Sequence, residues 1–329
     1  MNTYGTLFKV TLYGESHQEA IGVVIDGMKP GIKLDFDKIK NDLELRKPGA
    51  VGTTPRVEED DFTITSGLFN GVTTGSPIHL MIENKNVKSK DYAHLVSQPR
   101  PGHADFVAKV KYHGFHDYRG GGRFSGRLTA PLVAAGAIAK QMLPFKFSNE
   151  IIKISGLDNL EHMDAYLQDL KDKGDSAGGI VKLCVKNVPV GLGEPMFHKL
   201  DAEIGKMMLS MPAVKGVSIG TGFDGEDLLG STFNDVFEDG NGHTKTNHSG
   251  GISGGISNGN DIIVKVFVKP TSSIQKPQQS FNFENKEITN FNVGGRHDVA
   301  IIRRIGIVLE NVLALVLADF YLLAKAYNQ

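Results

Sequence analysis

The chain has a single cysteine, Cys184, and no tryptophan among its 329 residues. One thiol excludes an internal disulfide and a metal site built from several cysteines of one chain. It favours a reducing compartment, and we expect a cytoplasmic protein. An excess of one charge is also missing, because 36 basic residues are balanced by 37 acidic ones. The whole molecule therefore has no field that would attract nucleic acid or an anionic membrane, and any anion must be bound locally.

Long uninterrupted apolar runs are absent too. Residues 1–14 lack a charged segment followed by an apolar run and a cleavage site, so we expect a first strand there and no secretion signal. The most apolar stretch, residues 305–327, is interrupted by Glu310, Asn311 and Asp319 before it reaches the roughly 20 apolar residues of a membrane span. We interpret it as a buried helix of a globular protein that does not bind membranes.

The chain has no low-complexity segment and no linker rich in proline or serine, so residues 1–329 are expected to form a single catalytic domain. The GDSAGG segment at 174–179 is the one candidate boundary. Hydrophobic periodicity predicts a mixed α+β chain. The predicted strands are 7–13, 78–82, 179–185 and 262–268, and the predicted helices are 35–45, 131–143, 158–173, 202–210 and 305–326. Strands and helices do not alternate strictly enough to favour a doubly wound parallel sheet.

Glycine is abundant and clustered, which lets the backbone approach a ligand closely. The cluster Gly120–Gly122 lies within Arg119-Gly-Gly-Gly-Arg123-Phe-Ser125-Gly-Arg127, just before a predicted helix. Free amides at a helix start, together with three arginines, predict an anion-binding cradle. The segment has neither the Walker A pattern nor a dinucleotide fingerprint. Three arginines this close would repel one another unless they were solvated or neutralised, and a solvated basic loop is the alternative.

A second segment, Gly14-Glu-Ser16-His17, directly follows the first predicted strand. A turn there would present a hydroxyl and an imidazole together at the edge of a cleft, where histidine can donate a proton near neutral pH. The G-x-S-x-G pattern of a serine hydrolase is absent. A histidine after a strand is more often an ordinary surface or core residue, and that alternative remains open.

A third segment, Arg100-Pro-Gly-His103-Ala-Asp105, places a guanidinium and an imidazole on one loop. Arginine binds phosphate or carboxylate through two parallel hydrogen bonds. The alternative is a surface turn capped by Asp105.

Three later segments repeat the same theme of flexible backbone with hydroxyl or cationic groups: residues 250–259, 269–273 and 294–298. Together they suit a ligand with a phosphate and a second anionic group. His113 and His116 are separated by Gly114, which argues against the helical spacing of zinc motifs. We predict no metal site and a structural role for both histidines.

In this order and at these separations, the segments resemble the chorismate synthase family from Gly5 to about Asp319. The matching motifs are GESH at 14–17, RKPG at 46–49, VTTGSPI at 72–78, RPGHAD at 100–105, YRGGGR at 118–123, AVKGVSIG at 213–220, GGISGGIS at 250–257, KPTSS at 269–273 and GGRHD at 294–298. The resemblance implies a sandwich in which a layer of helices lies between antiparallel sheets, assembled as a homotetramer. It also implies a 1,4-anti elimination of phosphate from 5-enolpyruvylshikimate 3-phosphate, which yields chorismate without net redox change but requires reduced FMN.

The resemblance assigns roles to individual residues. His17 would protonate the departing phosphate, His103 would protonate the reduced flavin, and Asp298 would assist proton removal through the flavin. The implied substrate contacts are Ser16, Arg46, Arg100 and Arg127. The implied flavin contacts are Arg123, Phe124, Ser125, Pro212, Ala213, Gly254, Lys269, Pro270, Thr271, Ser272, Ser273 and Arg296.

Some positions depart from the family pattern. Gln18, Phe124, Leu128 and Val299 replace the residues that are usual there, and they mostly neighbour the implied site residues. The second arginine of the early basic motif is replaced near Gly52, with Arg56 as the nearest cation, which removes one expected substrate or nicotinamide contact. The electrons that reduce the flavin would come from NADPH or from a separate flavin reductase.

Two other functions remain as alternatives. An oxidoreductase that passes hydride from a nicotinamide to FMN and onward would show net redox change. A nucleic-acid-binding protein could follow phosphates with the arginine-rich glycine loops. The near-neutral charge, the absence of tryptophan and the scarcity of interleaved aromatic and basic residues count against it.

Overall fold

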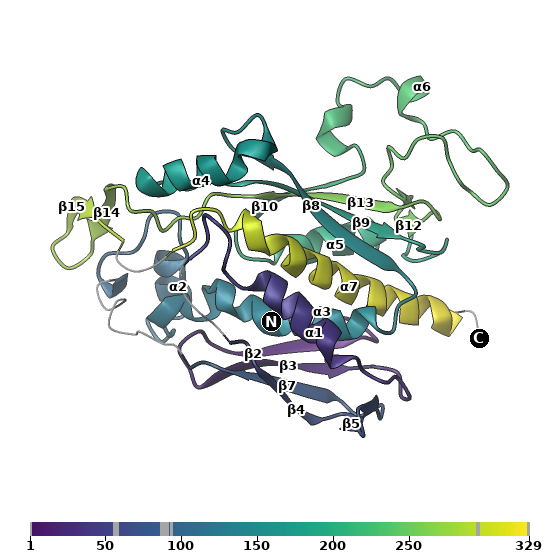
Figure 1. The fold of residues 1–329 in the computed structure, drawn as a ribbon, viewed down its shortest axis with the longest axis horizontal. Coiled ribbons are helices and arrows are strands. Elements are labelled where there is room, and N and C mark those ends of the chain that lie inside the picture. The colour runs from purple at the N-terminus through teal and green to yellow at the C-terminus, as the bar shows by residue number, and fades with distance from the viewer. Residues whose placement is uncertain (1, 55–58, 86–91, 93–94, 294–296, 328–329) are drawn as a thin grey trace.

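In the computed structural model, which describes residues 2–54, 59–85, 92, 95–293 and 297–327, two antiparallel sheets enclose a layer of helices. Figure 1 shows the sheets on opposite sides of the long helices. This is the sandwich that the family resemblance implies, and the expected α+β class is confirmed.

The first sheet is built from the N-terminal quarter of the chain in the order β1-β2-β3-β7-β4. Alternate residues of β7, Ile78, Leu80 and Ile82, are buried against the helices, as expected for a strand with one face in the core. The strands are β1 (Thr3–Tyr4), β2 (Lys9–Gly14), β3 (Ala20–Asp26), β4 (Phe62–Ser66) and β7 (Ile78–Glu83), and a small hairpin adds β5 (Leu68–Phe69) and β6 (Val72–Thr73).

The second sheet has the order β10-β13-β9-β8. Its two central strands alternate between buried and partly exposed positions, and they confirm the strands predicted at 179–185 and 262–268. The sequence analysis missed the edge strands. The bounds are β8 (Lys146–Ile154), β9 (Gly179–Lys186), β10 (Val214–Ile219) and β13 (Ile262–Val268).

The layer between the sheets contains α1 (Phe36–Arg46), α3 (Thr129–Lys140), α5 (Leu200–Leu209) and α7 (Ile302–Tyr327). Helices α3 and α7 pack closely because Gly136 has no side chain. A Cβ there would lie 2.3 Å from the carbonyl oxygen of Asn311. By length and composition α7 is apolar enough to cross a membrane, but most of it is buried between the sheets. It is the core helix expected from the sequence.

Two carboxylates of α7, those of Glu310 and Asp319, accept hydrogen bonds inside the fold. Glu310 accepts hydrogen bonds from Lys140 at 2.5 Å and from Asn149 at 2.6 Å. The carboxylate of Asp319 accepts from the backbone N–H groups of residues 6–8 at 2.7–2.8 Å. These carboxylates therefore connect α7 to the N-terminal segment, to α3 and to β8 rather than marking an exposed face.

The remaining elements lie around the sandwich. The helix predicted at 158–173 is a short 3-10 turn, Leu160–His162, followed by α4 (Met163–Asp172), and the GDSAGG segment connects α4 to β9. Helix α2 (Asp105–Lys111), which begins in the RPGHAD segment, was not predicted. The others are α6 (Gly230–Phe233), β11 (Ile252–Ser253), β12 (Ile256–Ser257), β14 (Gln278–Asn282) and β15 (Glu287–Phe291).

Candidate active site

A cleft of about 550 Å³ opens near the start of α7 and is lined by segments far apart in the sequence: 100–104, 120–127, 210–215, 269–273 and 297–304, with Thr54 and Tyr92. Its volume is within the range of small-molecule and cofactor sites. The described residues that line it include six cationic side chains, Arg100, Arg123, Arg127, Lys215, Lys269 and Arg304, but one carboxylate, Asp298. The cleft is therefore built to receive an anion, although the whole chain is nearly neutral.

The turn Gly120–Gly122 separates the two histidines that the sequence analysis singled out. All three glycines have positive φ, between +50° and +81°, which favours glycine over other residues. A Cβ at Gly120 would lie 2.4 Å from the His17 ring, whereas one at Gly121 would lie 3.6 Å from Cε1 of His103. The turn thus packs against both imidazoles, and its glycines bring them to opposite sides of one short loop.

Ser16 and His17 lie behind this turn, where the chain leaves β2. Ser16 is fully buried, and its Oγ has no hydrogen-bond partner. His17 is 6% exposed, and its ring makes an edge-on contact with Tyr92 at a centroid distance of 5.3 Å. Neither residue lines the cleft wall itself, but both contact Gly120, which does. A buried, unpaired hydroxyl beside an imidazole is a polar group that a bound ligand could satisfy.

The RPGHAD segment forms a network rather than a simple surface turn. Both carboxylate oxygens of Asp105 accept from the guanidinium of Arg100 at 2.8 Å, and Oδ1 also lies 2.8 Å from Nδ1 of His103. Burial alone would raise the pKa of Asp105, but the hydrogen bonds from Arg100 and His103 outweigh it and hold that pKa well below its usual range. Asp105 therefore remains ionised.

The loop after β13 contacts this network through Gly102. Lys269 Nζ donates to the Gly102 carbonyl at 2.6 Å and to Ser272 Oγ at 2.8 Å, and Ser272 donates to the same carbonyl at 2.7 Å. Burial, and then the nearby charge of Lys215, lower the pKa of Lys269. The buried Oγ1 of Thr271 has no partner. A lysine that is costly to charge and an unpaired hydroxyl both suit a bound phosphate.

Asp298 lines the cleft in the segment that leads into α7. Its Oδ1 accepts from the backbone N–H of Thr54 at 3.0 Å and is 3.9 Å from a guanidinium nitrogen of Arg304. Asp298, which was predicted to be catalytic, therefore lines the cleft.

Arg46 and Arg127 are both buried and share one carboxylate partner. Asp60 binds both guanidiniums, Arg46 at 2.9 Å and Arg127 through its other carboxylate oxygen. Arg46 is 1% exposed and also donates to Thr129 and to the Gly126 carbonyl. Of these two predicted substrate ligands, Arg127 lines the cleft and Arg46 lies behind it.

The expected repulsion within the arginine-rich segment is relieved by the protein itself. Asp117 binds Arg119 through both carboxylate oxygens, and Arg123 donates to the Gly14 carbonyl and to Asn2. With Asp60 on Arg127, the segment is not simply a solvated basic loop.

Most of the residues predicted to contact flavin line this cleft: Arg123, Phe124, Ser125, Pro212, Ala213, Lys269, Pro270, Thr271, Ser272 and Ser273. Gly254 does not. It lies in the turn between β11 and β12, where a Cβ would contact nothing within 4 Å. Arg296 and Arg56 lie outside the described residues.

Several groups at the site were missed from the sequence. Asp60, Arg304 and Tyr92 belong to no motif, and Lys215 lies in the AVKGVSIG motif but was assigned no role. Only an arginine in a buried segment, which needs a countercharge, could have suggested a partner such as Asp60. His113 and His116 form no cluster with other potential metal ligands in the described part of the chain.

Comparison with known proteins gives one consistent result. A family model described as chorismate synthase matches residues 8–322. A chorismate synthase of Chitinophaga pinensis is 49% identical over 331 residues, covering 100% of this chain and 99% of the relative. One of Methanocaldococcus jannaschii is 41% identical over 362 residues, covering 97% and 96%. A solved structure named "Crystal Structure of Chorismate Synthase" superposes with a TM-score of 0.74 at 26% identity and covers 97% of this chain and 92% of that one.

Proposed function

The chain belongs to the chorismate synthase family, and we propose that this cleft eliminates phosphate from 5-enolpyruvylshikimate 3-phosphate to give chorismate. One observation carries the placement of the reaction: two histidines flank a glycine turn at the wall of a cationic cleft. The reaction needs an acid for a departing phosphate and cations for the anions of its substrate, and both are present within this site.

The substrate anions bind to arginines held in fixed positions. Arg100 is fixed by two hydrogen bonds to Asp105, and Arg127 by Asp60 and by Asn84 at 3.1 Å. Guanidiniums whose planes are already set lose little freedom on binding phosphate or carboxylate. Arg46 contributes from behind Arg127 through the Asp60 carboxylate that they share.

His17 donates the proton to the departing phosphate oxygen. Its burial behind Gly120 keeps water away from the imidazole, and the Oγ of Ser16 beside it is free to donate a hydrogen bond to the same phosphate. General-acid catalysis of this kind contributes about 10²–10⁴-fold to a rate.

The residues of the cleft also fit reduced FMN. Lys269, Thr271 and Ser272 would hold its phosphate, and Arg123, Phe124, Ser125, Pro212 and Ala213 line the adjoining wall. When bound, the reduced flavin supplies a transient electron or a base. His103 donates a proton at the cofactor site, and Asp298 assists the removal of the substrate proton.

The proposal also covers the assembly of the protein and the source of the electrons that reduce the flavin. In the homotetramer that we propose, Gly254 would reach the cleft of a second chain, because within one chain it lies apart from the cleft. NADPH or a separate flavin reductase supplies the electrons. The single cysteine agrees with a cytoplasmic location.

An anaerobic assay tests the reaction. The protein is mixed with chemically reduced FMN and 5-enolpyruvylshikimate 3-phosphate, and chorismate absorbance and phosphate release are followed together. Equal amounts of both products, abolished in His17→Ala but retained in His243→Ala, are expected. His243 is a matched control because it lies on an exposed loop outside the cleft. Continuous consumption of reductant without chorismate would instead identify a flavin-dependent oxidoreductase.

A further inference from the structure

Asp105 contacts two candidate site residues, Arg100 and His103, although the family resemblance assigned it no role. Its Oδ2 accepts from the backbone N–H and Nε of Arg100 at 3.0 and 2.8 Å, and its Oδ1 accepts from Nη2 of the same arginine at 2.8 Å. Oδ1 also lies 2.8 Å from Nδ1 of His103. One carboxylate at the first position of α2 therefore contacts both a proposed substrate ligand and a proposed proton donor.

The atoms around Nδ1 of His103 determine which ring nitrogen carries the proton. This nitrogen lies 2.8 Å from an oxygen of Asp105 and 3.0 Å from Nη2 of Arg100. Carboxylates only accept hydrogen bonds and guanidiniums only donate them, so Nδ1 cannot satisfy both neighbours. An unprotonated Nδ1 would face its lone pair toward an ionised oxygen. A proton on Nδ1 is therefore favoured, which leaves Nε2 for the cleft. Nε2 then accepts a hydrogen bond when the ring is neutral and donates a proton when the ring is the imidazolium.

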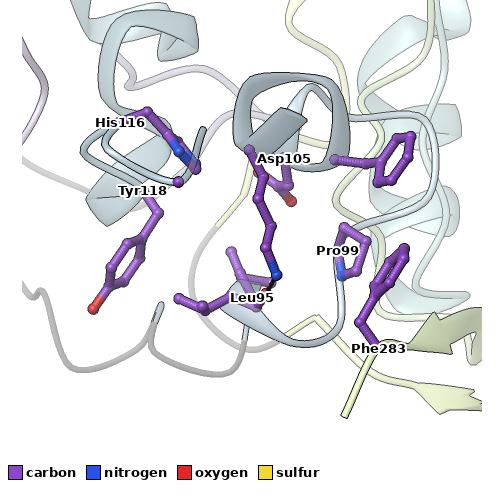
Figure 2. Close-up of a pocket in the computed structure, with 10 residues that line it drawn as sticks. Leu95, Pro99, Asp105, His116, Tyr118 and Phe283 are labelled. Carbon is purple, nitrogen blue, oxygen red and sulfur yellow. Dashed lines mark hydrogen bonds between the residues drawn. The ribbon is translucent and has the colours of Figure 1, made fainter. Parts of the chain in front are cut away.

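The other side of Asp105 is mostly apolar, although Lys109, His116 and Tyr118 also lie there. A small pocket of about 100 Å³ lies there, with Leu95, Pro99 and Phe283 in its lining, and Figure 2 shows Asp105 among these side chains. The Asp105 side chain is 10% exposed. Little water competes for the carboxylate, so its hydrogen bonds to Arg100 and His103 are stronger than they would be at the surface.

We propose that Asp105 is a positioning residue that holds His103 in the Nδ1–H tautomer, with Nε2 directed to the cleft, and fixes the guanidinium plane of Arg100. This inference rests on the proposed function for the roles of His103 and Arg100, but its geometry stands on the described contacts alone. Without the carboxylate, Arg100 is the remaining hydrogen-bond partner of Nδ1 among the described residues and would donate to it, which reverses the tautomer.

Nitrogen-15 magnetic resonance of histidine-labelled full-length protein, without cofactor or substrate, tests the proposal. The His103 signals are assigned with His103→Asn, at a pH where the imidazole is neutral. The wild type is expected to carry the proton on Nδ1, and Asp105→Asn to carry it mainly on Nε2. Asp105→Glu, which keeps a carboxylate, is expected to restore the Nδ1–H signal. An Nε2–H signal in the wild type, or an unchanged tautomer in Asp105→Asn, would overturn the proposal.

The chain offers a matched control. Asp239 contacts Nδ1 of His243 at 2.7 Å in the same way, but on an exposed loop. Asp239→Asn should change the His243 signals and leave those of His103 and the turnover number unaltered. In Asp105→Asn the turnover number should fall by about 10–100-fold. The tautomer is measured without substrate. The measurement therefore tests the positioning role even if the enzyme catalyses a different reaction.

Discussion

Replacing Gly120 by alanine tests whether the glycine turn sets the position of His17. The new Cβ would lie 2.4 Å from both Cδ2 and Nε2 of the imidazole and 3.0 Å from Ser16 Oγ. Carbon atoms in ordinary contact are about 3.5–4.0 Å apart, so the ring or the turn must move by roughly 1 Å. Gly121→Ala is the matched control, because its φ of +81° imposes similar strain, yet its Cβ would be 3.6 Å or more from every neighbouring side chain that it meets.

Gly120→Ala should lose at least as much stability as Gly121→Ala, because its Cβ also clashes with a buried ring, and it should lose far more activity. An alanine in the left-handed region costs about 1–2 kcal/mol at either position. Displacing a catalytic group by about 1 Å can cost about 10²-fold in rate. We therefore expect the turnover number to fall about 100-fold in Gly120→Ala and less than about 10-fold in Gly121→Ala. Anaerobic chorismate formation at saturating substrate, with thermal melts of both proteins, measures this. Equal losses of turnover in the two variants would refute the reasoning.

Three further perturbations follow from buried charges. Asp60→Asn leaves two buried arginines without their shared carboxylate and should destabilise the fold by about 3–5 kcal/mol in urea titrations, with Asp61→Asn as the neighbouring control. Asp319→Ala removes the acceptor of three backbone N–H groups and should cost about 3 kcal/mol or more, whereas a cost below about 1 kcal/mol would mean that water replaces it. The pKa of Lys269 is lowered in the folded protein, so folding disfavours its charged form. The resulting loss of folding stability is present at pH values below the folded pKa and disappears as pH rises through the ordinary value of 10.5. A bound phosphate favours the charged form, so FMN binding at pH values just below 10.5 should be accompanied by proton uptake. Calorimetry in buffers of different ionisation enthalpy measures this uptake. Binding without proton uptake would mean that Lys269 does not contact the phosphate.

The central strands and the core helices were predictable because their sequences are strongly apolar, and in the strands buried positions alternate with more exposed ones. Strand β13 is a run of β-branched residues, and α7 is apolar along most of its length. Strand β8 was missed because it is an edge strand in which most side chains are exposed, so its polar sequence carries no clear period. Helix α2 was missed because it spans seven residues and follows a proline-glycine turn that reads as a loop.

The chemistry of the site was predictable from its motifs, but the pairing of its charges was not. Arg127 meets Asp60 across 67 residues of sequence, and nothing near either residue in the chain indicates that contact. The arginine-rich segment suggested mutual repulsion unless its cations were solvated or neutralised, and Asp117 and Asp60 supply part of the countercharge from within the fold. Local pattern thus identified the cations, and only the tertiary structure shows which of them already have partners.

The loops that carry the two ligand sites are joined at one backbone carbonyl. Gly102, in the segment that bears Arg100 and His103, accepts hydrogen bonds from both Lys269 and Ser272. The same two side chains are the ones proposed to hold the phosphate of FMN. A phosphate oxygen is a stronger acceptor than a peptide carbonyl, because a charged partner strengthens a hydrogen bond. If Lys269 or Ser272 moves toward the cofactor, its hydrogen bond to the Gly102 carbonyl must weaken or break. The loop that carries the substrate-binding arginine would then change position.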